Sequence, residues 1–126
     1  MADHKILIIC GAQAEAEMVQ NLLGNSFAWT SIPPEWSRIE GELKEDFIKV
    51  VVIAGGKQDM VYDCIRYAQE TKSGVTIFVV STRPWTLTML LRQFPQVTFF
   101  NTSTIMKDAP GFSGFDLFVP KIQANL

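Results

Sequence analysis

Apolar residues follow two different patterns along the chain. Largely apolar runs occupy residues 6–10, 50–54, 75–80 and 97–100, as expected of strands that are covered on both faces of a parallel sheet. A fifth strand is predicted at residues 27–32, where the side chains alternate with period two. The order of these runs therefore predicts a protein with five strands.

The segments between the runs carry apolar residues at helical spacing and predict four helices, over residues 12–23, 35–46, 60–72 and 84–94. The inner stripe of the first helix is predicted to consist of Ala12, Ala16, Val19, Leu22 and Leu23. Glu15 lies off this stripe.

Alternating strands and helices predict one α/β domain over residues 1–126, with a doubly wound, five-stranded parallel sheet and helices on both faces. The last segment, residues 101–126, is less regular. Its proline and glycine residues predict a loop as far as Gly114. The remainder leaves two alternatives open, a short strand over 115–119 or a docked helix that begins at Pro120.

Sheets of this kind bind ligands at the carboxyl ends of their strands. The candidate site residues are those that end the predicted strands: Cys10 with Gly11, Ala54 with Gly55 and Gly56, Ser81 with Thr82, and Asn101 with Thr102. Neither glycine-rich nucleotide-binding motif is present. His4 is the only histidine, and no metal site or histidine-based triad can be assembled. We therefore expect no metal and no cofactor.

The composition is that of an ordinary globular domain, with 126 residues, 48% hydrophobic and 19% charged. The formal net charge is −2, and the basic residues are scattered, so neither nucleic acid nor a membrane is an expected partner. The first apolar run is too short for a signal peptide or a membrane span. Cys10 and Cys64 lie in apolar segments and are expected to be free thiols, which fits a cytoplasmic protein.

The order and spacing of these elements resemble the receiver domain of two-component response regulators, best over residues 36–82. The strand that ends in Ser81 and Thr82 is similar to the receiver strand that ends in a hydroxyl residue. The resemblance covers nearly the whole chain and implies a flavodoxin-like, CheY-like fold. It also implies a pocket in which two acids after the first strand hold a divalent cation and an aspartate at the end of the third strand accepts a phosphoryl group. A hydroxyl after the fourth strand and a lysine after the fifth respond to the new charge.

Carried over residue by residue, this chemistry is missing from the chain. The acid pair falls on Cys10 and Gly11, the phosphoacceptor on Ala54, the hydroxyl on Ser81 or Thr82, and the lysine on Asn101 or Thr102. Alanine offers no nucleophile. Lys107 lies too far along the chain to replace the lysine, and Asp59 is interpreted as a helix cap. The resemblance therefore implies a degenerate receiver, or pseudo-receiver, without phosphorylation and without catalysis.

The function expected of such a domain is protein–protein interaction, with a partner or as a homodimer, within a larger signalling or transcriptional regulator. Receivers use the face around their fourth helix for this purpose, and Arg83, Trp85 and Arg92 lie near it. Tryptophan and arginine are common interface anchors. A second possibility leaves Trp85 folded over the strand ends as a lid.

Two alternatives remain open. The first is a small-molecule sensor, in which the glycines at the strand ends, Gly11, Gly55 and Gly56, line a pocket that a ligand can approach closely. The second is a phosphotransferase subunit of the B type, because Cys10 and Gly11 after the first strand resemble its phosphocysteine loop. Glu15 and Glu17 oppose this second alternative, since two carboxylates repel phosphate and raise the pKa of a thiol.

Overall fold

The computed structural model describes residues 5–126; His4 lies outside the described residues. A single sheet of parallel strands runs in the order β2-β1-β3-β4-β5-β6. The strands are β1 (Ile6–Cys10), β2 (Trp29–Ile32), β3 (Val50–Ala54), β4 (Thr76–Ser81), β5 (Thr98–Asn101) and β6 (Ser113–Gly114). The α-helices are α1 (Gln13–Leu23), α2 (Trp36–Leu43), α3 (Gln58–Thr71), α4 (Thr88–Gln93) and α5 (Phe118–Ala124), and short 3₁₀ helices precede α4 (η1, Pro84–Thr86) and α5 (η2, Phe115–Leu117). The predicted α/β class and parallel sheet are confirmed.

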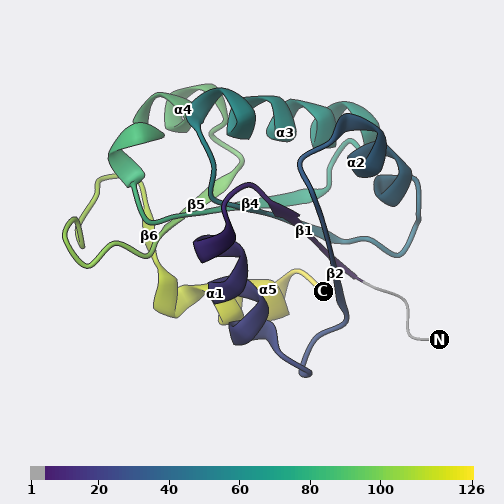
Figure 1. Ribbon diagram of the computed structural model, residues 1–126, viewed down its shortest axis with the longest axis horizontal. Helices are drawn as coiled ribbons and strands as arrows, with labels where there is room; N and C mark the ends of the chain where they lie inside the picture. Colours follow the sequence, from purple (N-terminus) through teal and green to yellow (C-terminus); the bar gives the residue numbers. More distant parts are fainter. Residues whose placement is uncertain (1–4) are drawn as a thin grey trace.

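The pleat of the strands sends alternate side chains to two separate hydrophobic clusters. Leu7, Ile9, Val51 and Ile53 pack in a cluster with residues of α2, α3 and α4. The residues between them on the same strands pack with residues of α1 and α5. Figure 1 shows α2, α3 and α4 on one side of the sheet and α1 and α5 on the other. All five residues of β3 are fully buried, because this strand lies between β1 and β4.

The prediction of five strands is wrong, because the end of the predicted loop forms a sixth. Ser113 pairs with Phe100, and Gly114 pairs with Asn101. A strand of two residues is too short to produce a readable period in the sequence. It extends the sheet at the β5 edge.

Of the two alternatives for the C-terminal segment, the helix is confirmed and the strand is wrong. The helix begins at Phe118, before Pro120, because proline is tolerated in the first turn of a helix, where its missing N–H has no partner to lose. Phe118 and Ile122 are buried. The Phe118 ring packs edge-on against Phe100, with ring centroids 5.2 Å apart, which docks α5 on the sheet.

The inner stripe of α1 also differs from the prediction. Leu22 is exposed, and Glu15, which lies off the predicted stripe, is buried. Predicted boundaries shift by a few residues elsewhere: β2 begins at Trp29, α2 ends at Leu43, and the predicted fourth helix divides into η1 and α4. These shifts leave the order of elements unchanged.

Replacement of Val52 by aspartate should unfold the domain. Val52 is fully buried in β3, between Ile8 of β1 and Phe78 of β4. An unpaired buried charge costs several kcal/mol, a large part of the stability of a domain of this size. Chemical denaturation followed by circular dichroism measures the loss, and Thr104→Asp, at an exposed loop position, is the matched control. A Val52→Asp variant as stable as the control would contradict the placement of β3.

Candidate functional site

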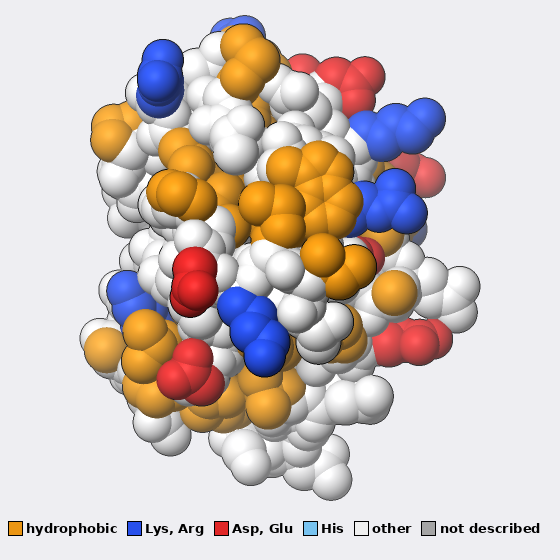
Figure 2. Space-filling view, turned by 90° about the vertical axis from the view of Figure 1, so that its left-hand side faces the viewer, with side chains coloured by type: hydrophobic (Ala, Val, Ile, Leu, Met, Phe, Trp, Pro, Cys, Tyr) orange, Lys and Arg blue, Asp and Glu red, His pale blue; other side chains and the backbone are white. Residues whose placement is uncertain are grey.

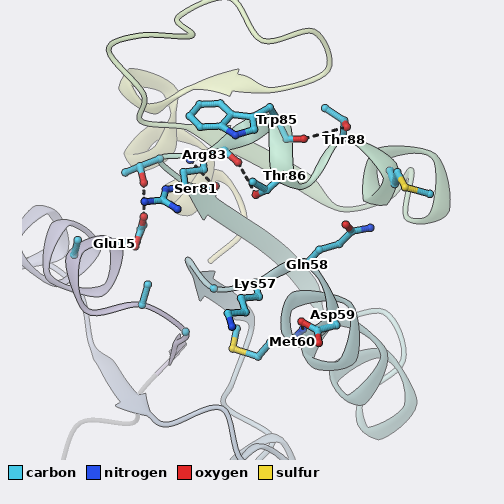
Figure 3. Close-up of a pocket in the computed structure, with 16 residues that line it drawn as sticks. Glu15, Lys57, Gln58, Asp59, Met60, Ser81, Arg83, Trp85, Thr86 and Thr88 are labelled. Carbon is cyan, nitrogen blue, oxygen red and sulfur yellow. Dashed lines mark hydrogen bonds between the residues drawn. The ribbon is translucent and has the colours of Figure 1, made fainter.

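A cavity of about 1060 Å³ opens at the carboxyl ends of β1, β3 and β4. Its lining comes from three segments, within residues 11–15, 56–60 and 81–89, and we call it the strand-end cavity. Figure 3 shows Glu15 from α1, Lys57 from the turn before α3 and Trp85 from η1 around it. The cavity therefore lies where a parallel sheet normally binds its ligands.

Backbone hydrogen bonds hold together the turns that follow β1 and β3, next to this cavity. The N–H groups of Gly11 and Ala12 both donate to the carbonyl oxygen of Ala54, at 3.1 and 3.0 Å, and the N–H of Gly55 donates to Val80 at 2.8 Å. A side chain at Gly11 would clash with the carbonyl oxygen of Gly55. Gly11 and Gly55 thus allow the turns after β1 and β3 to touch, and their N–H groups already donate to backbone carbonyl oxygens. This use of the N–H groups weakens the hypothesis that these two glycines receive an anion.

Glu15 is the one charged residue of the described chain that is buried, with 7% of its surface exposed. It lies in the first turn of α1 and lines the strand-end cavity. Its Oε1 accepts a hydrogen bond from Thr82 Oγ1 at 2.5 Å, and its Oε2 lies against Gly55. The ion pairs among residues 5–126 do not include Glu15, so no lysine or arginine nitrogen in this part of the chain lies within 4 Å of its carboxylate. A buried carboxylate with a neutral partner thus marks the floor of the cavity.

None of the positions that the receiver resemblance assigns to acids carries a carboxylate, and two of them, Cys10 and Ala54, lie outside the cavity lining. Ala54 is fully buried in the cluster formed with α1 and α5. Cys10 packs against the same cluster, and its Sγ lies 3.9 Å from Gln20 Nε2. Of these assigned positions, only Gly11 lines the cavity at the end of β1.

The two candidates for the hydroxyl position both line the cavity, but they have different partners. Ser81 is buried, and its Oγ accepts the backbone N–H of Arg83 at 3.0 Å. Thr82 donates to Glu15. The hydroxyl that contacts a carboxylate is therefore Thr82.

Asn101, assigned to the lysine position, holds a loop. Its side-chain amide donates to the carbonyl oxygens of Met106 and Lys107, and its Oδ1 accepts the N–H of Ser103 at 2.8 Å. Neither Asn101 nor Lys107 lines the strand-end cavity. Asp59 does line it, but the residue before α3 is Lys57, so Asp59 belongs to the first helical turn and is not the N-cap.

Burial raises the pKa of the Cys10 thiol above its ordinary value, although a hydrogen bond with Ser31 acts in the opposite direction. Burial likewise raises the pKa of Cys64 to about 11. Both cysteines are free, as predicted. A protonated thiol outside the cavity lining gives no support to the phosphocysteine alternative.

Arg83, Trp85 and Arg92 are all exposed, and Trp85 also lines the strand-end cavity. Trp85 therefore lies at the cavity mouth without being buried, with 46% of its surface exposed. Further large hydrophobic side chains are exposed on α4 and on the loop between β5 and β6, and we call the set the apolar rim: Trp85, Met89, Ile105 and Met106. Figure 2 shows hydrophobic side chains gathered on the side of the molecule that these elements form.

No family model matches the chain, and no curated protein or solved structure matches it either. No helix within residues 5–126 is long and apolar enough to cross a membrane. The described residues also contain no group of three or more His, Cys, Asp and Glu side chains that could hold a metal ion. What the site does must therefore be argued from its own geometry.

Alkylation of Cys10 by iodoacetamide should be slow at neutral pH. Because the folded thiol has a raised pKa, its thiolate fraction should still increase above about pH 8.5, the ordinary pKa of cysteine. Mass spectrometry of a Cys64→Ser variant across pH measures the rate at Cys10 alone. A rate that already reaches its plateau below pH 7 would contradict this assignment and favour a reactive cysteine.

Proposed function

We propose that this chain is a receiver-like regulatory module that binds a protein partner and carries out no phosphoryl transfer. The strand order β2-β1-β3-β4-β5 is the flavodoxin-like order, with β6 added at the edge. The free thiols are consistent with a cytoplasmic protein. This fold and the residues at its strand ends support the proposal.

The hydrogen bond between Thr82 and Glu15 is the main observation behind the proposal of a receiver-like module without phosphoryl transfer. In the receiver pattern, the hydroxyl after the fourth strand responds to a phosphoryl charge carried by the third strand. Here the third strand ends in Ala54, which has no nucleophile, and the hydroxyl donates to a carboxylate that the chain itself supplies. A carboxylate of the chain itself thus takes the place of the phosphoryl group as the partner of this hydroxyl. We infer that the conformation of the domain does not depend on a phosphoryl donor.

The apolar rim is the proposed binding face. It combines the exposed indole of Trp85 with exposed Met89, Ile105 and Met106, and Arg83 and Arg92 are exposed on the same segment of the chain. Exposed apolar side chains next to arginine and tryptophan are typical of interaction surfaces.

Phosphoryl donors should leave the domain unchanged. Acetyl phosphate or beryllofluoride with Mg²⁺ should give no gain in mass and no shift in amide resonances, because β3 ends in Ala54, which has no nucleophile, and the described residues hold no cluster of three ligating side chains for the cation. The measurements are intact mass and a two-dimensional amide spectrum. A stoichiometric phosphoryl adduct would end the proposal of a non-phosphorylated module.

Trp85→Ala should weaken association by about 2 kcal/mol or more, as truncation of a central aromatic anchor does. Arg92→Ala should cost only about 0–1 kcal/mol, as expected for an exposed ion pair. Sedimentation equilibrium measures self-association, and a pull-down from lysate measures capture of another protein. Trp36→Ala is the matched control, because Trp36 has a similar exposure, 41%, and belongs to α2, away from η1 (Figure 1). Equal effects of the two tryptophan variants would contradict the assignment of the face.

The strand-end cavity favours a second candidate function, that of a small-molecule sensor. Its volume of about 1060 Å³ lies slightly above the usual range for small-molecule pockets, about 300–1,000 Å³. Its lining combines large apolar side chains, Met60, Trp85 and Met89, with a majority of polar and charged residues, so it offers a ligand both a packing surface and hydrogen-bonding groups.

A further inference from the structure

The carboxylate of Glu15 carries a charge that the described part of the chain does not neutralise. Thr82, its hydrogen-bond partner, is neutral, and no lysine or arginine nitrogen of residues 5–126 lies within 4 Å. The N-terminus of α1 supplies about half an elementary charge at most. Buried carboxylates are normally paired with a cation. A positively charged group next to the Glu15 carboxylate would therefore be electrostatically favourable.

The cavity gives such a group access to Glu15. Glu15 is 7% exposed and still lines the strand-end cavity, so a ligand in the cavity lies next to this residue. The two basic residues of the lining, Lys57 and Arg83, are exposed. Asp59, a third exposed charged residue of the lining, is acidic, so the solvent side carries charges of both signs, and Glu15 is the charged residue on the buried side. An anionic group small enough to reach the floor would be repelled by Glu15.

Apolar side chains supply the remaining recognition. Trp85, Met60 and Met89 line the same cavity, and Figure 3 shows Trp85 and Glu15 on neighbouring sides of it. An indole face attracts both cations and flat apolar groups. A bare metal ion fits poorly, because the described residues provide one buried carboxylate and no cluster of three ligating side chains.

We propose that the strand-end cavity binds a small organic molecule with a primary ammonium group, which donates to Glu15, and an aromatic or apolar body, which packs against Trp85 and Met89. This inference rests on the second candidate function, small-molecule binding, and names the ligand chemistry. It does not depend on the interaction role of the apolar rim.

Three indole compounds that differ only in the charge of their side chain test the proposal on the unmodified protein. Tryptamine carries an ammonium group, tryptophol a hydroxyl and indole-3-acetate a carboxylate. Tryptamine should bind about tenfold or more tightly than tryptophol, because a hydrogen bond to a buried charge is stronger than a neutral one, and indole-3-acetate should bind most weakly. Titrations followed by amide resonances measure affinity and location together, with shifts expected at Gly11, Gly55 and Thr82. Failure of tryptamine to bind at millimolar concentration, or binding no tighter than that of tryptophol, overturns the proposal.

Glu15→Gln tests the role of the carboxylate. The amide oxygen can still accept from Thr82, so the variant keeps the shape and the hydrogen bond while it loses the charge. Its affinity for tryptamine should fall to that for tryptophol. Glu17→Gln is the matched control, because Glu17 lies on the same helix, is exposed and bonds only to Gln13; its affinity should stay unchanged. An unchanged affinity for tryptamine in Glu15→Gln overturns the proposal.

The two proposals fail separately. If tryptamine does not bind, only the ligand site is refuted, and Trp85→Ala should still weaken association more than Trp36→Ala does. Conversely, if Trp85→Ala does not weaken association while tryptamine binding still depends on Glu15, the proposed interaction face is lost and the ligand site stands.

Discussion

The carbonyl oxygen of Ala54 holds two turns together, and the geometry of the site depends on this contact. It accepts the N–H groups of both Gly11 and Ala12, so the start of α1 is tied to the end of β3. The turns can approach this closely only because Gly11 has no side chain to meet the carbonyl of Gly55. One turn of helix later, Glu15 is carried over Gly55 and into the cavity. The burial of this carboxylate is therefore a consequence of backbone packing.

A buried carboxylate needs compensation, and three features provide part of it. Thr82 donates a hydrogen bond, the first turn of α1 contributes its positive end, and the adjacent cavity leaves one side of the group accessible. None of these supplies a full positive charge. Glu15 consequently belongs to both proposals, since one rests on its hydrogen bond with Thr82 and the other on its place in the cavity lining.

The sequence predicts the fold where the apolar pattern is long and fails where it is short or where the pattern is not the deciding factor. The runs at residues 6–10 and 50–54 correspond to β1 and β3 without change, because burial on both faces leaves no polar positions in them. The two residues of β6 carry no such pattern. An amphipathic pattern cannot predict the burial of Glu15, because Glu15 lines the cavity at the strand ends, whereas its neighbour Ala16 packs in the apolar cluster. The one usable signal was its place in the first helical turn, where acids are favoured.

Trp85 connects the strand-end cavity with the apolar rim. It lines the cavity and belongs to the apolar rim, with nearly half of its surface in contact with solvent. A ligand that packs against its indole covers part of the surface proposed for the partner, or alters how that surface is presented. Binding at the two places is then thermodynamically coupled, and the coupling is reciprocal: a ligand that weakens the partner's binding is itself bound more weakly in the presence of the partner, by the same factor. If both proposals hold, the position of Trp85 between the cavity and the exposed surface makes partner binding responsive to a small molecule.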